Sequence, residues 1–327
     1  MTTVAIIGAG LSALSAARWL AQTGCNVALF EKSRGPGGRL STRRESWGQF
    51  DQGAQYFTAR DHRFLTQLEH WRERGVVAPW AFEPMVWKQG ELSASPDRQQ
   101  RWVGIPGMSA LSRDLASGLH IHSQLRIVAL RQQRQQWWLH DHHGQQHGPY
   151  DGVLISAPAA QTADLLPDDC PLRRDVSRIS MQPCWSVTLA YAQALAQPWV
   201  QGVFCQHPVV RWVAGNNSKP GRPPAPHTWV LHLQPAWSRQ HLQRPPAEIA
   251  QLARQILGEI LNCTPPREQH HYVHRWRYAQ PVNDDRLAQL VDASGKLGVC
   301  GDWTEGGRVE GAYLSGLRAA ASLLSAL

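Results

Sequence analysis

Small residues and one acid near the start of the chain have the spacing of a phosphate-binding turn. Gly8, Gly10 and Ala13 follow an apolar run at residues 4–7, and Glu31 stands 23 residues after the first glycine. The first position permits a tight turn, the second lets a pyrophosphate approach the backbone, and the third lets a helix pack closely on a strand. A helix N-terminus favours phosphate charge, and a carboxylate can accept hydrogen bonds from a ribose diol. The pattern predicts a dinucleotide site, because a purely structural glycine turn would leave Glu31 without a role.

The charge of the chain points to an anionic small ligand. Its 327 residues include 33 Lys and Arg against 25 Asp and Glu, which gives a formal net charge of +8. Only four of the basic residues are lysines, and the arginines are scattered in runs no longer than two. Nucleic-acid-binding proteins usually gather basic residues on one element, with aromatic residues between them. We therefore expect no nucleic-acid partner.

Metal sites, disulfides and membrane segments are not expected. The His-rich stretch at residues 140–147 could suggest a metal, but we expect a solvated hairpin there. The six cysteines are far apart and form no CxxC pair, which predicts reduced thiols and a cytoplasmic protein. The apolar run at residues 4–20 is too short to span a membrane and follows no basic region, so we expect neither a membrane span nor a signal peptide.

The predicted elements fall into two groups that must position these residues. Short apolar strands and helices are expected near both ends of the chain. The strands are at residues 4–7, 26–30, 120–122, 126–130, 137–140, 153–156 and 297–300, and the helices follow residue 10 and lie at 64–74, 109–116 and 311–324. Between residues 171 and 281, aromatic-rich strands at 184–191, 209–214, 228–234 and 270–278 surround one clear helix at 248–261. Strands joined by loops are typical of an antiparallel sheet.

These groups predict an α/β fold, α+β overall, with two domains. A Rossmann-like nucleotide-binding domain is expected from residues 1–62, 101–168 and 288–327. A second, mainly antiparallel-sheet substrate domain is expected from residues 63–100, which include a hairpin at 86–92, and from residues 169–287.

Four further stretches carry a family resemblance. They are the glycine-rich run at residues 31–42, the run Asp-Gln-Gly-Ala-Gln-Tyr-Phe-Thr at 51–58, and the C-terminal run at 301–316, joined by His-Arg-Trp-Arg-Tyr-Ala at 274–279. On these motifs the sequence resembles the flavin-containing amine oxidase superfamily, and within it the bacterial members of the renalase family. The resemblance covers essentially the whole chain.

The resemblance implies a bound FAD and assigns contacts to it. The implied contacts fall into three sets. One set binds the phosphates, a second binds the ribose and the adenine, and a third lies beside the flavin ring and its ribityl chain. The implied residues are Gly8, Gly10 and Ala13 for the pyrophosphate, Gly38 and Arg39 along the diphosphate, Glu31 and Lys32 at the ribose, the backbone of Ile127 at adenine, Ala54, Gln55 and Tyr56 beside the isoalloxazine, Asp302 at the ribityl hydroxyls, and Glu310, Gly311 and Ala312 at the flavin O2 edge.

The resemblance also implies a reaction. Renalase-family members take hydride onto flavin N5 from aberrant dihydro isomers of NAD(P)H, reduced at ring position 2 or 6. The products are NAD(P)⁺ and, after reoxidation by O₂, H₂O₂. Since the dihydropyridine becomes aromatic when hydride leaves, no general base is required and no catalytic side chain is expected. The implied partners are a small-molecule dinucleotide and O₂.

Residues near the predicted flavin strand and on the aromatic strands are the substrate-side candidates. They are Phe57, Arg60, Trp185, Trp276 and Arg277. Core packing is the better explanation for any single tryptophan, and His274, a candidate polar neighbour of the ring, fits an ordinary strand histidine better. Many amine oxidases place a lysine near flavin N5, and none of the four lysines of this chain has an evident position for that role. The alternatives left open are a flavin amine oxidase acting on a small amine and a flavin-binding protein without turnover.

Overall fold

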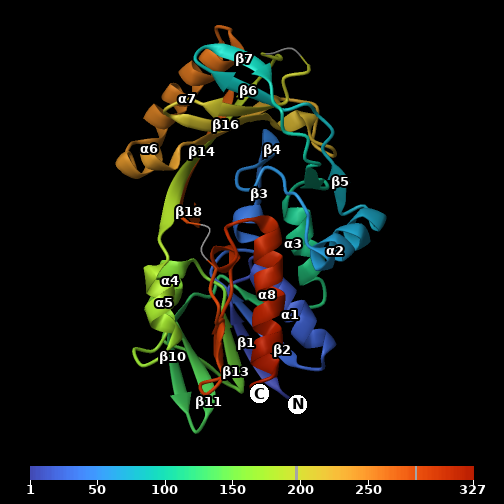
Figure 1. The fold of residues 1–327 in the computed structure, drawn as a ribbon. Helices are drawn as coiled ribbons and strands as arrows, with labels where there is room; N and C mark the ends of the chain where they lie inside the picture. The colour runs from blue at the N-terminus through green and yellow to red at the C-terminus, as the bar shows by residue number, and fades with distance from the viewer. Residues whose placement is uncertain (196–197, 284–285) are drawn as a thin grey trace.

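The computed structural model describes residues 1–195, 198–283 and 286–327, which form two large sheets at opposite ends of the molecule (Figure 1). The first sheet has the strand order β19-β20-β13-β1-β2-β9 and is parallel except at β19. Its central strands are apolar and buried because both faces of the sheet are covered. The strands are β1 (Thr3–Ile7), β2 (Asn26–Glu31), β9 (His120–Ser123), β13 (Gly152–Ile155), β19 (Val291–Asp292) and β20 (Leu297–Val299).

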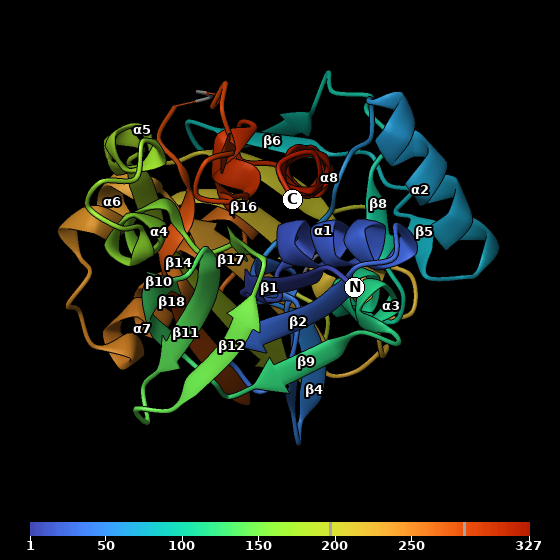
Figure 2. The same cartoon turned by 90° about the horizontal axis from the view of Figure 1, so that it is seen from below.

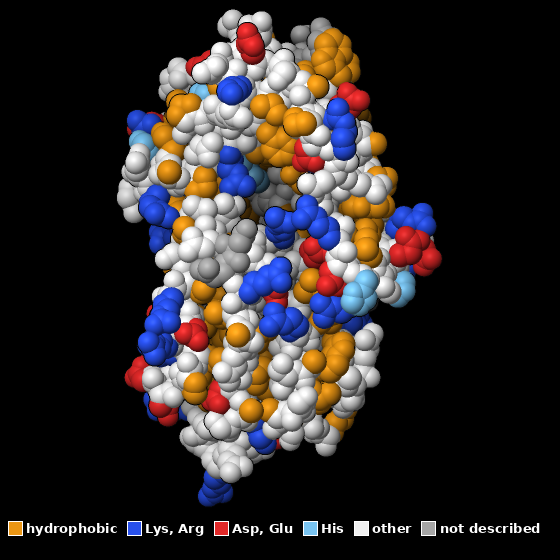
Figure 3. Space-filling view, in the orientation of Figure 1, with side chains coloured by type: hydrophobic (Ala, Val, Ile, Leu, Met, Phe, Trp, Pro, Cys, Tyr) orange, Lys and Arg blue, Asp and Glu red, His pale blue; other side chains and the backbone are white. Residues whose placement is uncertain are grey.

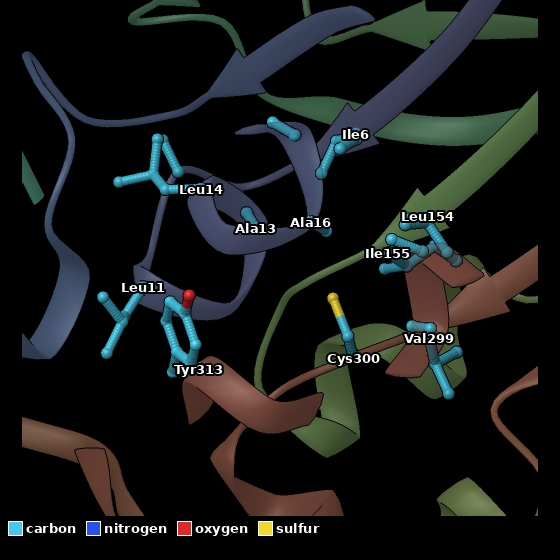
Figure 4. Close-up of a cluster of buried hydrophobic side chains, with 14 of the residues drawn as sticks. Ile6, Leu11, Ala13, Leu14, Ala16, Leu154, Ile155, Val299, Cys300 and Tyr313 are labelled. Carbon is cyan, nitrogen blue, oxygen red and sulfur yellow. The ribbon is translucent and has the colours of Figure 1, made fainter. Parts of the chain in front are cut away.

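Helices cover one face of this sheet and a small antiparallel sheet covers the other (Figure 2). The helices are α1 (Leu11–Gln22), α3 (Ser109–Ala116) and α8 (Val309–Leu324), and the small sheet consists of β10 (Ile127–Gln133), β11 (Gln136–Asp141) and β12 (Gln146–Tyr150). Figure 4 shows side chains from α1, α8 and three strands of the sheet gathered in one apolar core. The first and last helices touch at Gly316, where a Cβ atom would overlap Ser15 Oγ and the backbone oxygen of Ser12.

The second sheet has seven strands in the order β18-β14-β17-β16-β15-β6-β7 and is antiparallel except between β15 and β6. Helices α6 (Pro235–Gln240) and α7 (Pro246–Leu261) cover its outer face, and its inner face looks toward the first sheet (Figure 1). The strands are β6 (Met85–Lys88), β7 (Glu91–Ala94), β14 (Met181–Tyr191), β15 (Gly202–Gln206), β16 (Val210–Gly215), β17 (His227–Leu233) and β18 (His270–Pro281).

Shorter elements connect the two sheets. Helix α2 packs Phe64, Leu68 and Trp71 into the core of the first sheet, so this part of residues 63–100 shares the core of the nucleotide-binding fold. Two small two-stranded antiparallel sheets belong to the same region. The connecting elements are α2 (His62–Glu73), α4 (Ala159–Leu165), α5 (Leu172–Arg178), and the strand pairs β3 (Thr42–Glu45) with β4 (Gly48–Asp51) and β5 (Val77–Pro79) with β8 (Trp102–Gly104).

The predicted fold class is confirmed: a Rossmann-like domain is joined to a sheet-rich second domain. The prediction of a single helix among the aromatic strands is wrong, because α5 and α6 also lie between residues 171 and 281. These two helices have seven and six residues, too few to show a helical period in the sequence.

Candidate functional site

A cavity of about 1610 Å³ lies between the carboxyl ends of the parallel strands and the inner face of the second sheet. Figure 3 shows the molecule hollowed at this level, with Lys and Arg side chains near the opening. In open parallel sheets ligands bind at the carboxyl ends of the strands. The volume exceeds the roughly 300–1,000 Å³ of an ordinary small-molecule pocket. The cavity can therefore hold more than one drug-sized group.

The predicted phosphate turn opens into this cavity. Gly8 has φ +103° and approaches Ser156 so closely that a Cβ atom would lie 2.5 Å from its backbone oxygen. Gly10 is the N-cap of α1, lines the cavity, and has no atom within 4 Å of the place where its Cβ would stand. The free N–H groups of the helix start thus have space for a phosphate in front of them. Ala13 lies behind the turn, fully buried in the core, as the close-packing role requires (Figure 4).

Glu31 is fixed at the edge of the cavity. Its Oε2 accepts a hydrogen bond from the Ala9 N–H, and its Oε1 accepts one from the Ser33 N–H, both at 2.8 Å. Each carboxylate oxygen has a further lone pair that a ribose hydroxyl could use. The turn, the helix start and Glu31 together fit the dinucleotide part of a flavin cofactor.

Arg39 and Asp302, both predicted to contact FAD, form a salt bridge at the cavity wall. Arg39 donates to both carboxylate oxygens of Asp302, at 2.8 and 2.5 Å, and to the backbone oxygen of Ala279 at 3.0 Å. This bidentate salt bridge joins residues that are 263 positions apart in the chain. It brings the second glycine-rich segment, strand β18 and the C-terminal segment to one place, and the roles of both residues toward FAD stay predictions.

The segment that the resemblance places beside the isoalloxazine lines the cavity and is irregular, apart from an isolated bridge between Phe57 and Trp102. Ala54, Gln55, Tyr56 and Phe57 all line the cavity. The Gln55 side chain donates to the backbone oxygens of Asp51 and Gly53 and accepts from Lys219 Nζ at 3.0 Å. Its amide is therefore held in one orientation.

Behind this segment lies a buried ionic cluster that sequence reasoning missed. The Asp51 carboxylate is fully buried and accepts from Arg222 at 2.5 Å, from Lys219 at 3.4 Å, from Thr42 Oγ1 and from the Met108 N–H. Burial alone would raise the pKa of Asp51, but the Lys219 and Arg222 charges outweigh it and lower the pKa. The sequence indicates no lysine near the flavin strand, whereas the structure buries Lys219 directly against Gln55.

The ammonium group of Lys219 predicts a pH effect on stability. Burial lowers its pKa from 10.5 to about 8, although the Asp51 charge opposes the shift. Between these values the unfolded chain binds more protons than the folded chain, so this group makes stability rise with pH. In Lys219→Met the rise should be absent, and the wild type should gain on the variant from pH 7 to pH 10 in urea unfolding. If the free energies of unfolding of the wild type and the variant changed in parallel with pH, the lowered pKa of Lys219 would be contradicted.

Most predicted site residues line the cavity, and four do not. Those that line it are Gly8, Gly10, Glu31, Lys32, Gly38, Arg39, Ala54, Gln55, Tyr56, Phe57, Arg60, Ile127, Trp276, Arg277, Asp302 and Ala312. The other four are Ala13, Trp185, Glu310 and Gly311. Glu310 instead accepts from the backbone N–H groups of Arg60 and Asp61, which fixes the loop before α2.

The assignment of Trp185 to the substrate side is wrong. Its ring is buried in the outer core against α7, and its Nε1 donates to the His241 backbone oxygen. Side chains alternate between the two faces of a strand, so the neighbouring Cys184 faces the cavity instead. The sequence analysis assigned the wrong face of β14 to the cavity, which is an error of one residue along the strand.

The inner face of the second sheet supplies a cavity wall that the sequence analysis did not identify. It contains polar and aromatic side chains from all five longer strands: Gln182, Cys184, Phe204, Arg211, Trp212, His232 and Tyr272. Burial and the Arg211 charge lower the pKa of His232 to about 3, so this imidazole is neutral. Arg101 lies over the rings of Tyr56, Phe82 and Phe204 at 5.1 to 5.5 Å. Period-two alternation along the strands could have found this wall.

The cavity wall is strongly positive. Among the described residues eleven Lys and Arg line it against four Asp and Glu, an excess of seven where the whole chain has +8. The basic residues are Lys32, Arg34, Arg39, Arg43, Arg60, Arg101, Arg126, Arg211, Arg275, Arg277 and Arg308, and the acids are Glu31, Asp97, Asp164 and Asp302. The described part of the chain contains no His, Cys, Asp and Glu cluster able to hold a metal, and none of its helices is long and apolar enough to cross a membrane.

Comparisons with known proteins agree with this architecture. The family model described as flavin containing amine oxidoreductase matches residues 73–324, and the model described as NAD(P)-binding Rossmann-like domain matches residues 6–68. Solved structures with the same fold include cyclohexylamine oxidase from Brevibacterium oxydans IH-35A (14% identity, TM-score 0.77) and a putrescine oxidase double mutant (14% identity, TM-score 0.75). A provisionally assigned protoporphyrinogen oxidase from Exiguobacterium sp. 255-15 is similar at 14% identity and a TM-score of 0.78. In each case 99% of both chains is covered.

Proposed function

Since this chain belongs to the flavin-containing amine oxidoreductase family, we propose that it is an FAD-dependent oxidase of the renalase type. Its substrates would be 2- and 6-dihydro isomers of NAD(P)H, which lose hydride to give NAD(P)⁺, while O₂ takes up the two electrons and two protons as H₂O₂. The observation that carries the proposal is the charge of the cavity, an excess of seven positive side chains around a space of about 1610 Å³. A second dinucleotide beside FAD would bring the diphosphate charge that this wall favours.

The same charge disfavours the alternative of an amine oxidase. A small amine is a cation at neutral pH and would enter a cavity of like charge. Arg101, a cation of the protein itself, already lies over the rings of Tyr56 and Phe204. The amine substrates in the names of the structural relatives therefore suit this cavity less well than an anionic substrate.

The side chains at the cavity suit a reaction without proton abstraction. Bound FAD would supply the two-electron hydride acceptor. Burial lowers the pKa of His232 to about 3, and burial with the Arg43 charge lowers the pKa of His274, so both imidazoles are weaker bases than an ordinary histidine. The protein would then have to bind the dinucleotide, orient its nicotinamide ring against the flavin and exclude water.

A donor screen under anaerobic conditions tests the proposal. The purified protein should be yellow, and borohydride-reduced NAD, a mixture of dihydro isomers, should bleach it rapidly. Cyclohexylamine, putrescine and ordinary 4-dihydro NADH should bleach it slowly or not at all. Rapid bleaching by an amine alone would favour the amine oxidase, and no bleaching by any donor would favour a flavin-binding protein without turnover.

Gly10→Ala tests the cofactor site separately. A Cβ at this position meets no protein atom, so the FAD-free variant should unfold at the same urea concentration as the FAD-free wild type. The methyl group would stand where a phosphate must approach, and losing charge-assisted hydrogen bonds there should weaken FAD binding about ten- to a hundredfold. Isothermal titration of the FAD-free protein measures this. Gln22→Ala, exposed at the other end of α1, is the control; equal FAD affinity in both variants would refute the phosphate position.

The proposed location is the cytoplasm, and the proposed partners are the dinucleotide and O₂ alone. The six cysteines lie far apart in the sequence without a CxxC pair, which favours a reducing compartment. Eleven of the 33 Lys and Arg residues line the cavity, and the basic residues form no run longer than two in the sequence, which does not favour a nucleic-acid partner.

A further inference from the structure

Arg211 is a cation of the cavity wall without an acidic partner. Among the described residues no carboxylate lies within ion-pair distance of its guanidinium, whereas Arg101 on the same wall is paired with Asp97 at 2.6 Å. Arg211 donates to the amide oxygen of Gln280 at 2.9 Å, which leaves four of its five N–H donors for a ligand. The side chain is half-buried, so a molecule in the cavity can reach it.

A bulge in β16 gives Arg211 its place on the cavity wall. Val210 and Trp212 pair with adjacent residues of β17, so Arg211 between them is an extra residue without a partner across the strands. Neighbours on a regular strand point to opposite faces of the sheet. Arg211 and Trp212 nevertheless both line the cavity, as a bulge permits. Bulges are frequent beside binding and active sites, where they redirect a side chain.

The contacts of Arg211 place it near the position expected for the flavin. The ring of Trp212, its neighbour in the chain, has its centroid 5.5 Å from that of Tyr56, which the family resemblance places beside the isoalloxazine. Gln280 is one residue away from the backbone oxygen that accepts from Arg39. In a dinucleotide whose nicotinamide ring lies against a flavin, one ribose separates that ring from the nearest phosphate. A long arginine side chain at this point of the wall can bind such a phosphate.

We propose that Arg211 binds the phosphate next to the nicotinamide ribose of the substrate, and that it makes the enzyme select nucleotides over ribosides that lack a phosphate. A guanidinium presents parallel N–H donors that match two phosphate oxygens. The phosphates of FAD have the helix start at Gly10, on the first sheet and across the cavity from β16. The inference rests on the proposed function, because it names the part of that substrate which the second sheet recognises.

Three donors test the site. Borohydride reduction of NAD, nicotinamide mononucleotide and nicotinamide riboside gives mixtures of dihydro isomers, and the last two donors differ by one phosphate alone. Anaerobic bleaching of the FAD-loaded protein over a range of donor concentrations gives a limiting rate and a half-saturating concentration for each. The wild type should be half-saturated by the mononucleotide at a concentration about 10- to 100-fold lower than by the riboside, the factor that charge-assisted hydrogen bonds to a phosphate produce.

Arg211→Gln should abolish this preference. The half-saturating concentrations of the two phosphorylated donors should rise about 10- to 100-fold, while the limiting rates and the values for the riboside stay unchanged. NAD⁺ titrated into the variant, with the flavin absorbance as readout, should show the same loss without turnover. Arg211→Lys keeps the charge without the planar fork and should recover part of the loss, and it replaces Arg211→Gln if thermal unfolding shows that variant to be unfolded. Arg131→Gln, exposed on β10 and outside the cavity lining, is the matched control.

The outcomes separate this inference from the proposed function. A wild type without preference for the mononucleotide, or a variant that keeps the preference, would overturn the phosphate contact and leave the proposed function standing. A loss of FAD affinity in FAD-free Arg211→Gln, measured by isothermal titration and with the donor preference unchanged, would assign the guanidinium to the cofactor instead. A wild type that none of the three donors bleaches would overturn the proposed function and this inference together.

Discussion

Asp51→Asn is expected to lower the free energy of unfolding by about 3–5 kcal/mol, the cost of leaving buried charges without their partner. Asp51 is fully buried, and its carboxylate is the acid that faces both Lys219 and Arg222. An Asn side chain keeps the shape and removes the negative charge. The Lys219 ammonium and the Arg222 guanidinium would then repel each other in a region that water does not reach.

Urea unfolding at pH 7 measures this loss. Glu69→Gln is the matched control, since it removes a carboxylate from a half-exposed pair with Arg72 on α2, and its unfolding transition should stay near that of the wild type. The lowered pKa of Asp51 adds a second readout. Its contribution to stability is complete above the ordinary carboxyl pKa of 3.8 and declines as the pH falls through the lower folded value, a dependence that Asp51→Asn should lack. A variant as stable as the wild type would show that the cluster holds no charged pair.

Gly316→Ala is expected to destabilise the protein by about 1–3 kcal/mol or more, as overpacking of a close contact does. The added methyl would overlap Ser15 Oγ and the Ser12 backbone oxygen, so α8 would have to move away from α1. This contact also sets the position of Ser315, which accepts from the Gly301 N–H and shares a hydrogen bond with Thr304. The displacement would therefore extend to the segment that contains Asp302.

Ser322→Ala is the control for this prediction. It lies on an exposed part of the same helix and differs from Gly316→Ala in having no neighbour to displace. Thermal and urea unfolding of the FAD-free variants should show the loss only at Gly316. Equal midpoints for the two variants would contradict the close packing of α8 against α1.

The parts of the fold and site that the sequence predicted are those encoded locally. Gly8, Gly10 and Glu31 lie within one strand-turn-helix-strand unit, so their spacing alone defines their geometry. The longer strands of the second sheet could also be located, because their runs of apolar and aromatic residues are long enough to recognise. Helices of six or seven residues, such as α6, do not.

The parts that could not be predicted depend on contacts between distant segments. Nothing near Lys219 in the sequence shows that it is buried against Asp51, 168 positions away. Which side chains of β14 point into the cavity depends on the side of the sheet against which α7 packs. Without that information the sequence favours Trp185 over Cys184 in the cavity.

The concentration of basic side chains around the cavity has a kinetic consequence. An anionic ligand approaching the opening is attracted over about one Debye length, roughly 8 Å at physiological ionic strength and 30 Å at 0.01 M. Encounter should therefore be fast in dilute buffer and slow markedly as salt is added, whereas an uncharged ligand would be captured at a rate nearly independent of salt. A cavity charged in this way should favour anionic ligands over free metal cations and amines at the encounter step.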